Sequence, residues 1–257
     1  FIPLAPLHQK HNLAGIRWFM KHHPELPNIP CFDTAFHAKH SRLFTEYALP
    51  KSLRDKGIRR YGFHGLSFEW IARQLQEHHK DLAQGRVVIA HLGNGASLCA
   101  LNRGQSIDTT MGLTALDGLP MGTRCGSLDP GAITYMIREL NLDVATVEEL
   151  LYNQSGLLGL SGLTNDVKTI EATNTEDCRF ALDYFCLETA QHIGMMCVAL
   201  GGIDAIIFTG GIGEHSQQIR QKILKHTECL HPGRDLVIPT NEERMMALHA
   251  QTRLGSE

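Results

Sequence analysis

The sequence has no feature that predicts residence in a membrane or binding to a polyanion. None of its apolar stretches is longer than a strand, so no transmembrane helix is expected. No signal peptide is visible, although a leader removed before Phe1 stays an open alternative. Charges of both signs are mixed, with a net charge of −3 and no run of one sign. That balance argues against nucleic acid or a membrane surface as the main partner.

Paired cysteines, zinc-site spacings and the common nucleotide fingerprints are also missing. Seven Cys are scattered singly, and an odd number in a chain of 257 residues predicts reduced thiols in the cytoplasm. The 15 His include no H-E-x-x-H pair and no Cys/His cluster with zinc spacing. No G-x-x-x-x-G-K-[ST] string occurs, and Ser216 stands where a G-x-G-x-x-G fingerprint would need its third glycine. Neither a P-loop nor a dinucleotide-binding turn is predicted.

What the sequence does contain is a set of short strings that place donor side chains beside glycines. Arg59–Gly65 reads RRYGFHG, and Met121–Gly126 reads MGTRCG. Glycine lets a backbone approach a ligand closely, and an Arg fork or a His N–H can hold a phosphoryl group or a carboxylate. Together with FDTAFH at Phe32–His37 and HLGNG at His91–Gly95, these strings point to phosphoryl transfer.

Each of these residues also has an ordinary structural interpretation. His64 fits a hydrogen-bonded core histidine, Arg124 one half of an ion pair, and Asp33 a cap for the segment after it. On spacing alone, Asn94-Gly95 is most simply a type I′ hairpin turn. His64 differs from an average histidine because it precedes a predicted helix, whose N-terminal dipole favours an anion.

Hydrophobic periodicity and turn residues predict an α/β chain. Two strands within residues 86–101, hinged at Asn94-Gly95, and a third at 105–110 form a meander. Later, a strand at 204–209 runs into the glycines of 210–213 and then a helix, an order that puts a ligand at the carboxyl end of the strand. Further helices are predicted at 66–79, from Asp129-Pro130 toward 140, at a Thr146/Glu149 capping box, at 176–200, and after Thr240 as a cap.

Taken in order, the strings resemble the acetate kinase family, and matches run from Pro3–His8 to the last helix. The resemblance implies an α/β, RNase H-like (actin-like) fold of the sugar kinase–Hsp70–actin superfamily, with two domains and a cleft between them. Residues 35–240 would form the nucleotide-binding domain. Residues 1–34 and the closing helix at 241–257 would belong to the other domain. The family's N-terminal strand, its loop and a substrate-binding Arg have no counterpart after Phe1.

The resemblance also implies roles for individual residues. Asp33, His64 and Arg124 would be catalytic, and Glu242 would bind magnesium. Because a short carboxylic acid is already ionised near neutral pH, we expect Asp33 to orient an Arg, a water or the magnesium rather than to act as a base. Lys168 stands where the family usually has Arg. The nucleotide-binding residues would be His91, Leu92, Gly93, Asn94, Gly95, Asp166, Val167, Lys168, Gly210, Gly211, Ile212, Gly213 and Glu214.

The implied reaction is the reversible, Mg²⁺-dependent transfer of a phosphoryl group from ATP to acetate or propionate, which gives ADP and an acyl phosphate. A cytoplasmic homodimer is expected. The alternative is a non-catalytic nucleotide-binding module of the same fold, which the missing N-terminal region and the unusual residues Leu66, Phe68, Ser127 and His215 would fit. A sugar kinase of the same superfamily is less favoured, because RYGFHG and MGTRCG resemble acyl-kinase signatures.

Overall fold

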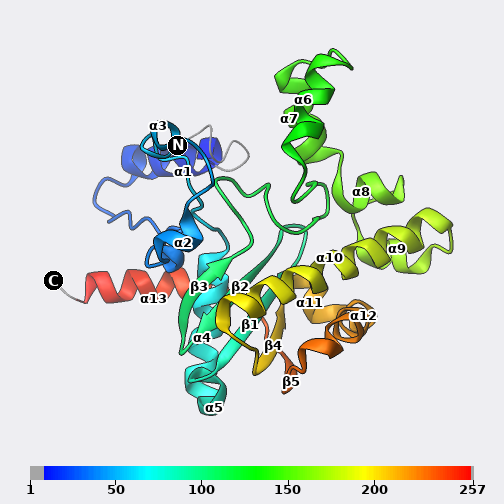
Figure 1. The fold of residues 1–257 in the computed structure, drawn as a ribbon. Helices are drawn as coiled ribbons and strands as arrows, with labels where there is room; N and C mark the ends of the chain where they lie inside the picture. The colour runs from blue at the N-terminus through cyan, green and yellow to red at the C-terminus, as the bar shows by residue number, and fades with distance from the viewer. Residues whose placement is uncertain (1–8, 256–257) are drawn as a thin grey trace.

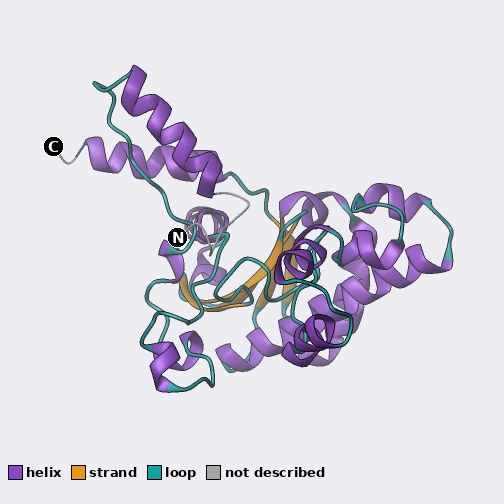
Figure 2. Cartoon of the chain, turned by 90° about the horizontal axis from the view of Figure 1, so that it is seen from above, coloured by secondary structure: helices purple, strands orange, loops and turns teal. Residues whose placement is uncertain are grey.

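The computed structural model describes residues 9–255, so the Pro3–His8 string lies outside the described residues. A single mixed sheet forms the centre of the molecule, and helices surround it (Figures 1 and 2). The elements in chain order are α1 (Gln9–His22), η2 (Ala35–His37), α2 (Arg42–Thr45), α3 (Lys51–Arg54), α4 (Gly65–His78), α5 (Lys80–Ala83), β1 (Arg86–Leu92), β2 (Ala96–Asn102), β3 (Gln105–Thr109), α6 (Pro130–Arg138), α7 (Val144–Asn153), α8 (Gly156–Ser161), α9 (Val167–Ala172), α10 (Glu176–Leu200), β4 (Ala205–Thr209), α11 (Gly210–His215), α12 (Gln217–Thr227), η3 (Glu228–Leu230), β5 (Arg234–Val237) and α13 (Glu242–Leu254).

The five strands lie in the order β3-β2-β1-β4-β5. The first three form the predicted antiparallel meander, and β4 and β5 continue the sheet parallel to β1. In the parallel register His91 lies beside Thr209, so the carboxyl ends of β1 and β4 meet at one edge of the sheet. Ligands of open α/β sheets bind at such an edge.

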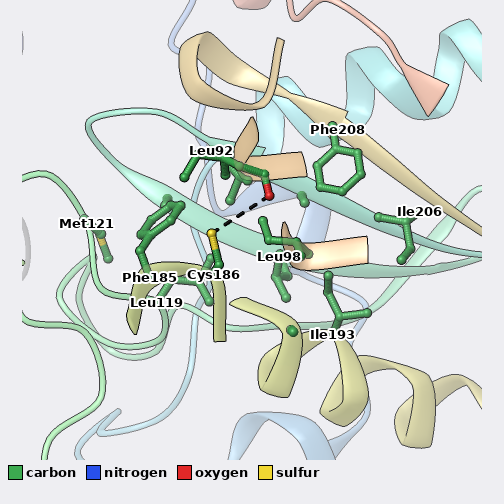
Figure 3. Close-up of a cluster of buried hydrophobic side chains, with 14 of the residues drawn as sticks. Leu92, Leu98, Leu119, Met121, Phe185, Cys186, Ile193, Ile206 and Phe208 are labelled. Carbon is green, nitrogen blue, oxygen red and sulfur yellow. Dashed lines mark hydrogen bonds between the residues drawn. The ribbon is translucent and has the colours of Figure 1, made fainter. Parts of the chain in front are cut away.

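Two hydrophobic cores, one on each face, hold the sheet between its helices. Because side chains alternate along a strand, Val88 and Ala90 of β1 pack toward α10, whereas Val87 and Ile89 pack toward α4. The first core brings Phe185 and Ile193 of α10 into one cluster with Leu92, Leu98 and Ile206, which come from three strands, as Figure 3 shows. Replacing such a buried Phe by Ala costs about 3–5 kcal/mol. The α10 layer is therefore a main source of stability.

Helix α10 shows how local sequence sets an element's ends. Thr175 caps its start by accepting from the Cys178 N–H, and Glu176 and Asp177 lie in the first turn, where the dipole favours negative charge. Gly201 ends the helix with a φ of 69°, which glycine adopts without strain. The predicted span of 176–200 is confirmed. Within residues 9–255, no helix is both long and apolar enough to cross a bilayer.

Two predicted helix caps are wrong by one residue or more. Asp143, rather than the Thr146/Glu149 capping box, caps α7, and its carboxylate accepts from the Thr146 N–H at 2.7 Å. Asn241, rather than Thr240, caps α13. In both cases a short polar side chain nearer the true helix start accepts from the exposed N–H groups of the first turn. The sequence spacing alone does not show which of the neighbouring polar residues is the cap.

Two glycine turns also differ from the sequence prediction. Neither Asn94 nor Gly95 has a positive φ, so their turn is not type I′. Positive φ at two successive turn residues occurs one hairpin later, at Arg103 and Gly104. Residues 210–213 are not an open turn, because they form the first part of the short helix α11.

Candidate active site

The two predicted nucleotide-binding turns lie side by side at the carboxyl ends of β1 and β4. A methyl group built on Gly210 would lie 2.8 Å from the Leu92 carbonyl oxygen, and one built on Gly93 would lie 3.9 Å from the Gly211 nitrogen. Close packing against Leu92 and a φ of 78° therefore require a glycine at Gly210, whereas Gly93 is in ordinary van der Waals contact with the other turn. Backbone N–H groups at the start of α11 and at Gly93–Gly95 share this edge of the sheet.

His64 faces the same edge from the start of α4. Its φ of 57° is unusual for a residue other than glycine and costs on the order of 1–3 kcal/mol unless the surroundings fix it. The imidazole Nδ1 lies 2.8 Å from Ser97 Oγ on β2, and the ring stacks on His91 at 4.4 Å between centroids. These contacts direct the opposite ring nitrogen, Nε2, toward Gly95.

Arg124 also reaches Gly95, close to His64. A methyl group built on Gly95 would lie 2.8 Å from Arg124 Nη2 and 3.1 Å from His64 Nε2. The guanidinium is half-buried and donates through Nη1 to the Ala115 carbonyl at 2.7 Å. Burial lowers the pKa of Arg124, but a guanidinium stays charged near neutral pH. The two donors predicted from RRYGFHG and MGTRCG thus meet at Gly95, in the turn between β1 and β2.

Two hydroxyl groups connect His91 to the segment before α13. Ser67 Oγ on α4 lies 2.8 Å from His91 Nδ1 and 2.7 Å from Thr240 Oγ1. Burial lowers the pKa of His91 to about 4, so its imidazole is neutral at pH 7. In this arrangement His91 supplies a hydrogen-bonded surface for His64 rather than a positive charge for a phosphate.

Two carboxylates of the site influence each other. Burial, and after it the negative charges of Asp33 and Glu243, raise the pKa of Glu242 to about 7. The Asp33 carbonyl accepts from the Gly65 N–H at 3.0 Å, which ties this segment to the residue after His64. Among residues 9–255 no group of three or more His, Cys, Asp or Glu could hold a metal. Two oxygen-donor carboxylates instead fit Mg²⁺, which is usually held by one or two carboxylates plus phosphate oxygens and waters.

Several other predicted nucleotide-binding side chains contact protein groups instead. Glu214 Oε1 accepts from the Gly210 N–H at 2.9 Å and from the Thr240 N–H at 3.1 Å, so it braces α11 against the segment before α13. Asn94 Oδ1 accepts from Asn165 Nδ2 at 2.8 Å. Gly211 and Gly213 lie in the same first turns of α11. The side chain of Ile212 packs on the core, and that of Leu92 is completely buried in it.

The predicted adenine-binding segment 166–168 lies at the start of α9. Asp166 caps this helix through the Thr169 N–H at 3.0 Å, and Val167 is buried in the core. Lys168 is exposed. The side chains of Asp166 and Val167 thus have structural partners, which leaves Lys168 and the backbone to face a ligand.

Ser97 is a site residue that the sequence did not reveal. It was not singled out from the sequence, whereas its hydroxyl contacts His64 Nδ1 and orients the ring. The turn between β1 and β2 contains three residues, Gly93–Gly95, and this length pairs Ser97 with His91 across the hairpin. A two-residue turn at Asn94-Gly95 would have shifted the register and turned Ser97 to the other face. The length of the β1–β2 turn is therefore the signal that would have placed Ser97 beside His64.

Comparison with known proteins fits this geometry. The acetokinase family model matches residues 1–244. The acetate kinase of Methylocella silvestris is 46% identical over 268 aligned residues, which are 96% of this chain and 66% of that protein. The crystal structure of Porphyromonas gingivalis acetate kinase matches with a TM-score of 0.91 and 34% identity over 98% of this chain and 70% of that one. A Francisella tularensis propionate kinase matches with a TM-score of 0.88 and 37% identity over 96% of this chain and 70% of that one.

The mixed sheet, with two glycine turns at one edge and an Arg and a His facing them, has the actin-like α/β fold that the resemblance implied. Within that class, the chain belongs to the acetokinase family. It spans 58 to 68% of the length of five curated relatives that it matches.

Proposed function

We propose that the protein transfers the γ-phosphoryl group of ATP to acetate or propionate, reversibly, to give an acyl phosphate and ADP. The observation that carries this proposal is the meeting of Arg124 and His64 at Gly95. Two donors directed at one point of a glycine turn fit the equatorial oxygens of a phosphoryl group in transfer, where charge is spread over three oxygens.

The chain's own residues would act mainly by positioning and by neutralising charge. Arg124 supplies a fixed positive charge, and His64 supplies a hydrogen-bond donor at Nε2 when Nδ1 accepts from Ser97. The substrate carboxylate is already an anion near neutral pH and can attack without a general base. Backbone N–H groups of the two glycine turns are suited to the other phosphates of the nucleotide.

Asp33 and Glu242 are the residues we propose for Mg²⁺. The raised pKa of Glu242, to about 7, arises from burial and from the negative charge of Asp33, and a nearby divalent cation would offset both costs. When bound, Mg²⁺ would supply positive charge that offsets the negative charge of the nucleotide phosphates. The two carboxylates would then orient the ion's water ligands.

The test is an acyl hydroxamate assay. The full-length gene product is incubated with MgATP, hydroxylamine and one of acetate, propionate or butyrate, and hydroxamate formation is followed. Product with acetate or propionate supports the proposal, and product with none of the three contradicts it. Acetate and propionate differ by one methylene, worth only about 1–3 kcal/mol in a pocket, so we expect both to react.

Two further measurements, made beside the hydroxamate assay, separate the alternatives. A non-catalytic nucleotide-binding module would bind ADP tightly in calorimetry and form no hydroxamate. A sugar kinase would instead consume ATP with glucose or glycerol. A cytoplasmic homodimer, and the division into a nucleotide-binding domain at 35–240 and a second domain, remain predictions from the family. Sedimentation of the full-length protein tests the dimer.

A further inference from the structure

The backbone that carries His64 has an unusual conformation at two nearly adjacent residues. Gly62 has a φ of 75° and His64 a φ of 57°, with Phe63 between them. A methyl group built on Gly62 would lie 2.7 Å from Cδ2 of His37 and 2.5 Å from Cγ2 of Thr109, so this turn is packed directly on the His37 ring. A non-glycine residue keeps a left-handed conformation only where its surroundings fix it.

His37 supplies that fixed surrounding. It ends η2, is 2% exposed, and its Nε2 lies 3.1 Å from the Phe63 carbonyl oxygen. A carbonyl only accepts hydrogen bonds, so Nε2 carries the proton and donates. The donated bond is to the peptide unit that joins Phe63 to His64. It therefore fixes the orientation of the peptide from which the left-handed turn starts.

A second set of bonds fixes the ring itself. With its proton on Nε2, neutral His37 accepts at Nδ1 from Ser106 Oγ at 2.9 Å. Ser106 in turn lies 2.7 Å from His40 Nε2 and 3.2 Å from Cys99 Sγ. Burial, and to a smaller extent the neighbouring His40, lowers the pKa of His37 to about 4. The ring is thus neutral at pH 7, with one tautomer set by its two partners.

We propose that His37 is a positioning residue for His64. It does not reach Gly95, but its Nε2–H donates to the Phe63 carbonyl. This bond holds the left-handed backbone at His64, which directs the His64 imidazole toward Gly95. Phe68 packs edge-on against both rings and fills the space between them, with ring centroids 5.8 Å from His37 and 6.5 Å from His64. This inference rests on the proposed phosphotransferase function.

The test compares two amide replacements of His37. The amide nitrogen of Gln extends about as far as Nε2 and can still donate to Phe63, whereas that of Asn extends only about as far as Nδ1. His37→Asn is expected to lower kcat at least tenfold, with KM for ATP and acetate changed less than threefold. His37→Gln is expected to stay within threefold of wild type in both constants. His192→Asn, at a buried histidine on α10, is the control for replacing a buried imidazole and should also stay within threefold.

Two kinetic outcomes with the His37 variants would overturn the inference: His37→Asn keeping kcat within threefold of wild type, or Gln and Asn lowering kcat equally. Should His37→Asn fail to fold, Ser106→Ala takes its place. It leaves the ring but removes its partner at Nδ1, and it should lower kcat threefold to tenfold, so an unchanged kcat would overturn the inference.

A readout without turnover separates this inference from the proposed function. In nitrogen-15 NMR of the ligand-free protein, the His64 ring signals, assigned by their loss in His64→Ala, should shift or broaden in His37→Asn and keep their positions in His37→Gln. Unshifted His64 signals in His37→Asn would contradict the inference even if wild type makes no hydroxamate. Absence of hydroxamate from wild type would contradict the proposed function alone.

Discussion

Gly95→Ala should remove most activity while leaving the fold nearly intact. Gly95 does not have a positive φ, so an alanine suits its backbone. The added methyl group would lie 2.8 Å from Arg124 Nη2 and 3.1 Å from His64 Nε2, both closer than ordinary van der Waals contact. The Arg124 atom is the end of a long side chain that can move away. The relaxation that accommodates the methyl group therefore displaces the groups that we assign to the reaction.

The expected magnitudes follow from the kind of atom that must move. Loss of one preorganised donor lowers kcat by roughly 10²–10³-fold in other enzymes, so we expect Gly95→Ala to lose at least about 100-fold. Its free energy of unfolding should change by less than about 1 kcal/mol. By contrast, a methyl group on Gly65 would lie 2.0 Å from the backbone oxygen of Asp33. Because backbone cannot swing aside, Gly65→Ala should cost on the order of 3 kcal/mol or more.

The assay pairs hydroxamate kinetics with urea unfolding of each variant. Gly194→Ala on α10 is the matched control, because no atom lies within 4 Å of its added methyl group. It should keep full activity and gain about 0.5–1 kcal/mol in stability. The reasoning is refuted if Gly95→Ala keeps kcat within threefold of wild type, or if it is as unstable as Gly65→Ala.

Three further predictions concern single contacts. Ser97→Ala removes the partner of His64 Nδ1 and should lower kcat about tenfold with little change in KM, measured by steady-state kinetics; an unchanged kcat contradicts it. Asn241→Ala removes the α13 cap and should cost about 1 kcal/mol in thermal unfolding, whereas Asn241→Asp should not. Burial depresses the pKa of His37 and His91 from 6.5 to about 4, so the unfolded chain binds more protons in that window. The contribution of each histidine to stability is full above about pH 6.5 and should fall toward pH 4, by up to about 3 kcal/mol, whereas Glu242, with its raised pKa, contributes with the opposite sign. A shift of the urea midpoint between pH 7.5 and 4.5 that is the same in wild type and in His37→Gln would contradict this.

Much of the fold could be predicted because its signals are local. The span of α10 follows from its buried stripe and its Thr175 cap, and the meander follows from turn residues between apolar strands. That the two glycine turns lie together was implied only by the resemblance, and the structure explains it, since the parallel strands β1 and β4 end at the same edge. The meeting of Arg124 with His64 was expected only from the family resemblance. The two residues are 60 positions apart, and no local sequence pattern predicts a contact over that separation.

What the sequence did not predict depends on register and on long-range packing. Ser97 faces His64 only because the β1–β2 turn is three residues long. Glu214 looked like a ligand contact, but its carboxylate is held by backbone N–H groups of Gly210 and Thr240, which are far apart in sequence. The role of His37 likewise depends on Phe63, 26 residues away. No local pattern identifies such partners.

The central claim is that the guanidinium of Arg124 and the imidazole of His64 act on the same phosphoryl group. A double-mutant cycle of Arg124→Ala and His64→Ala, measured as kcat in the hydroxamate assay, tests it most directly. Residues that act as a unit are not additive, so the double variant should be about as slow as the slower single variant. Rate losses that simply multiply would contradict the claim.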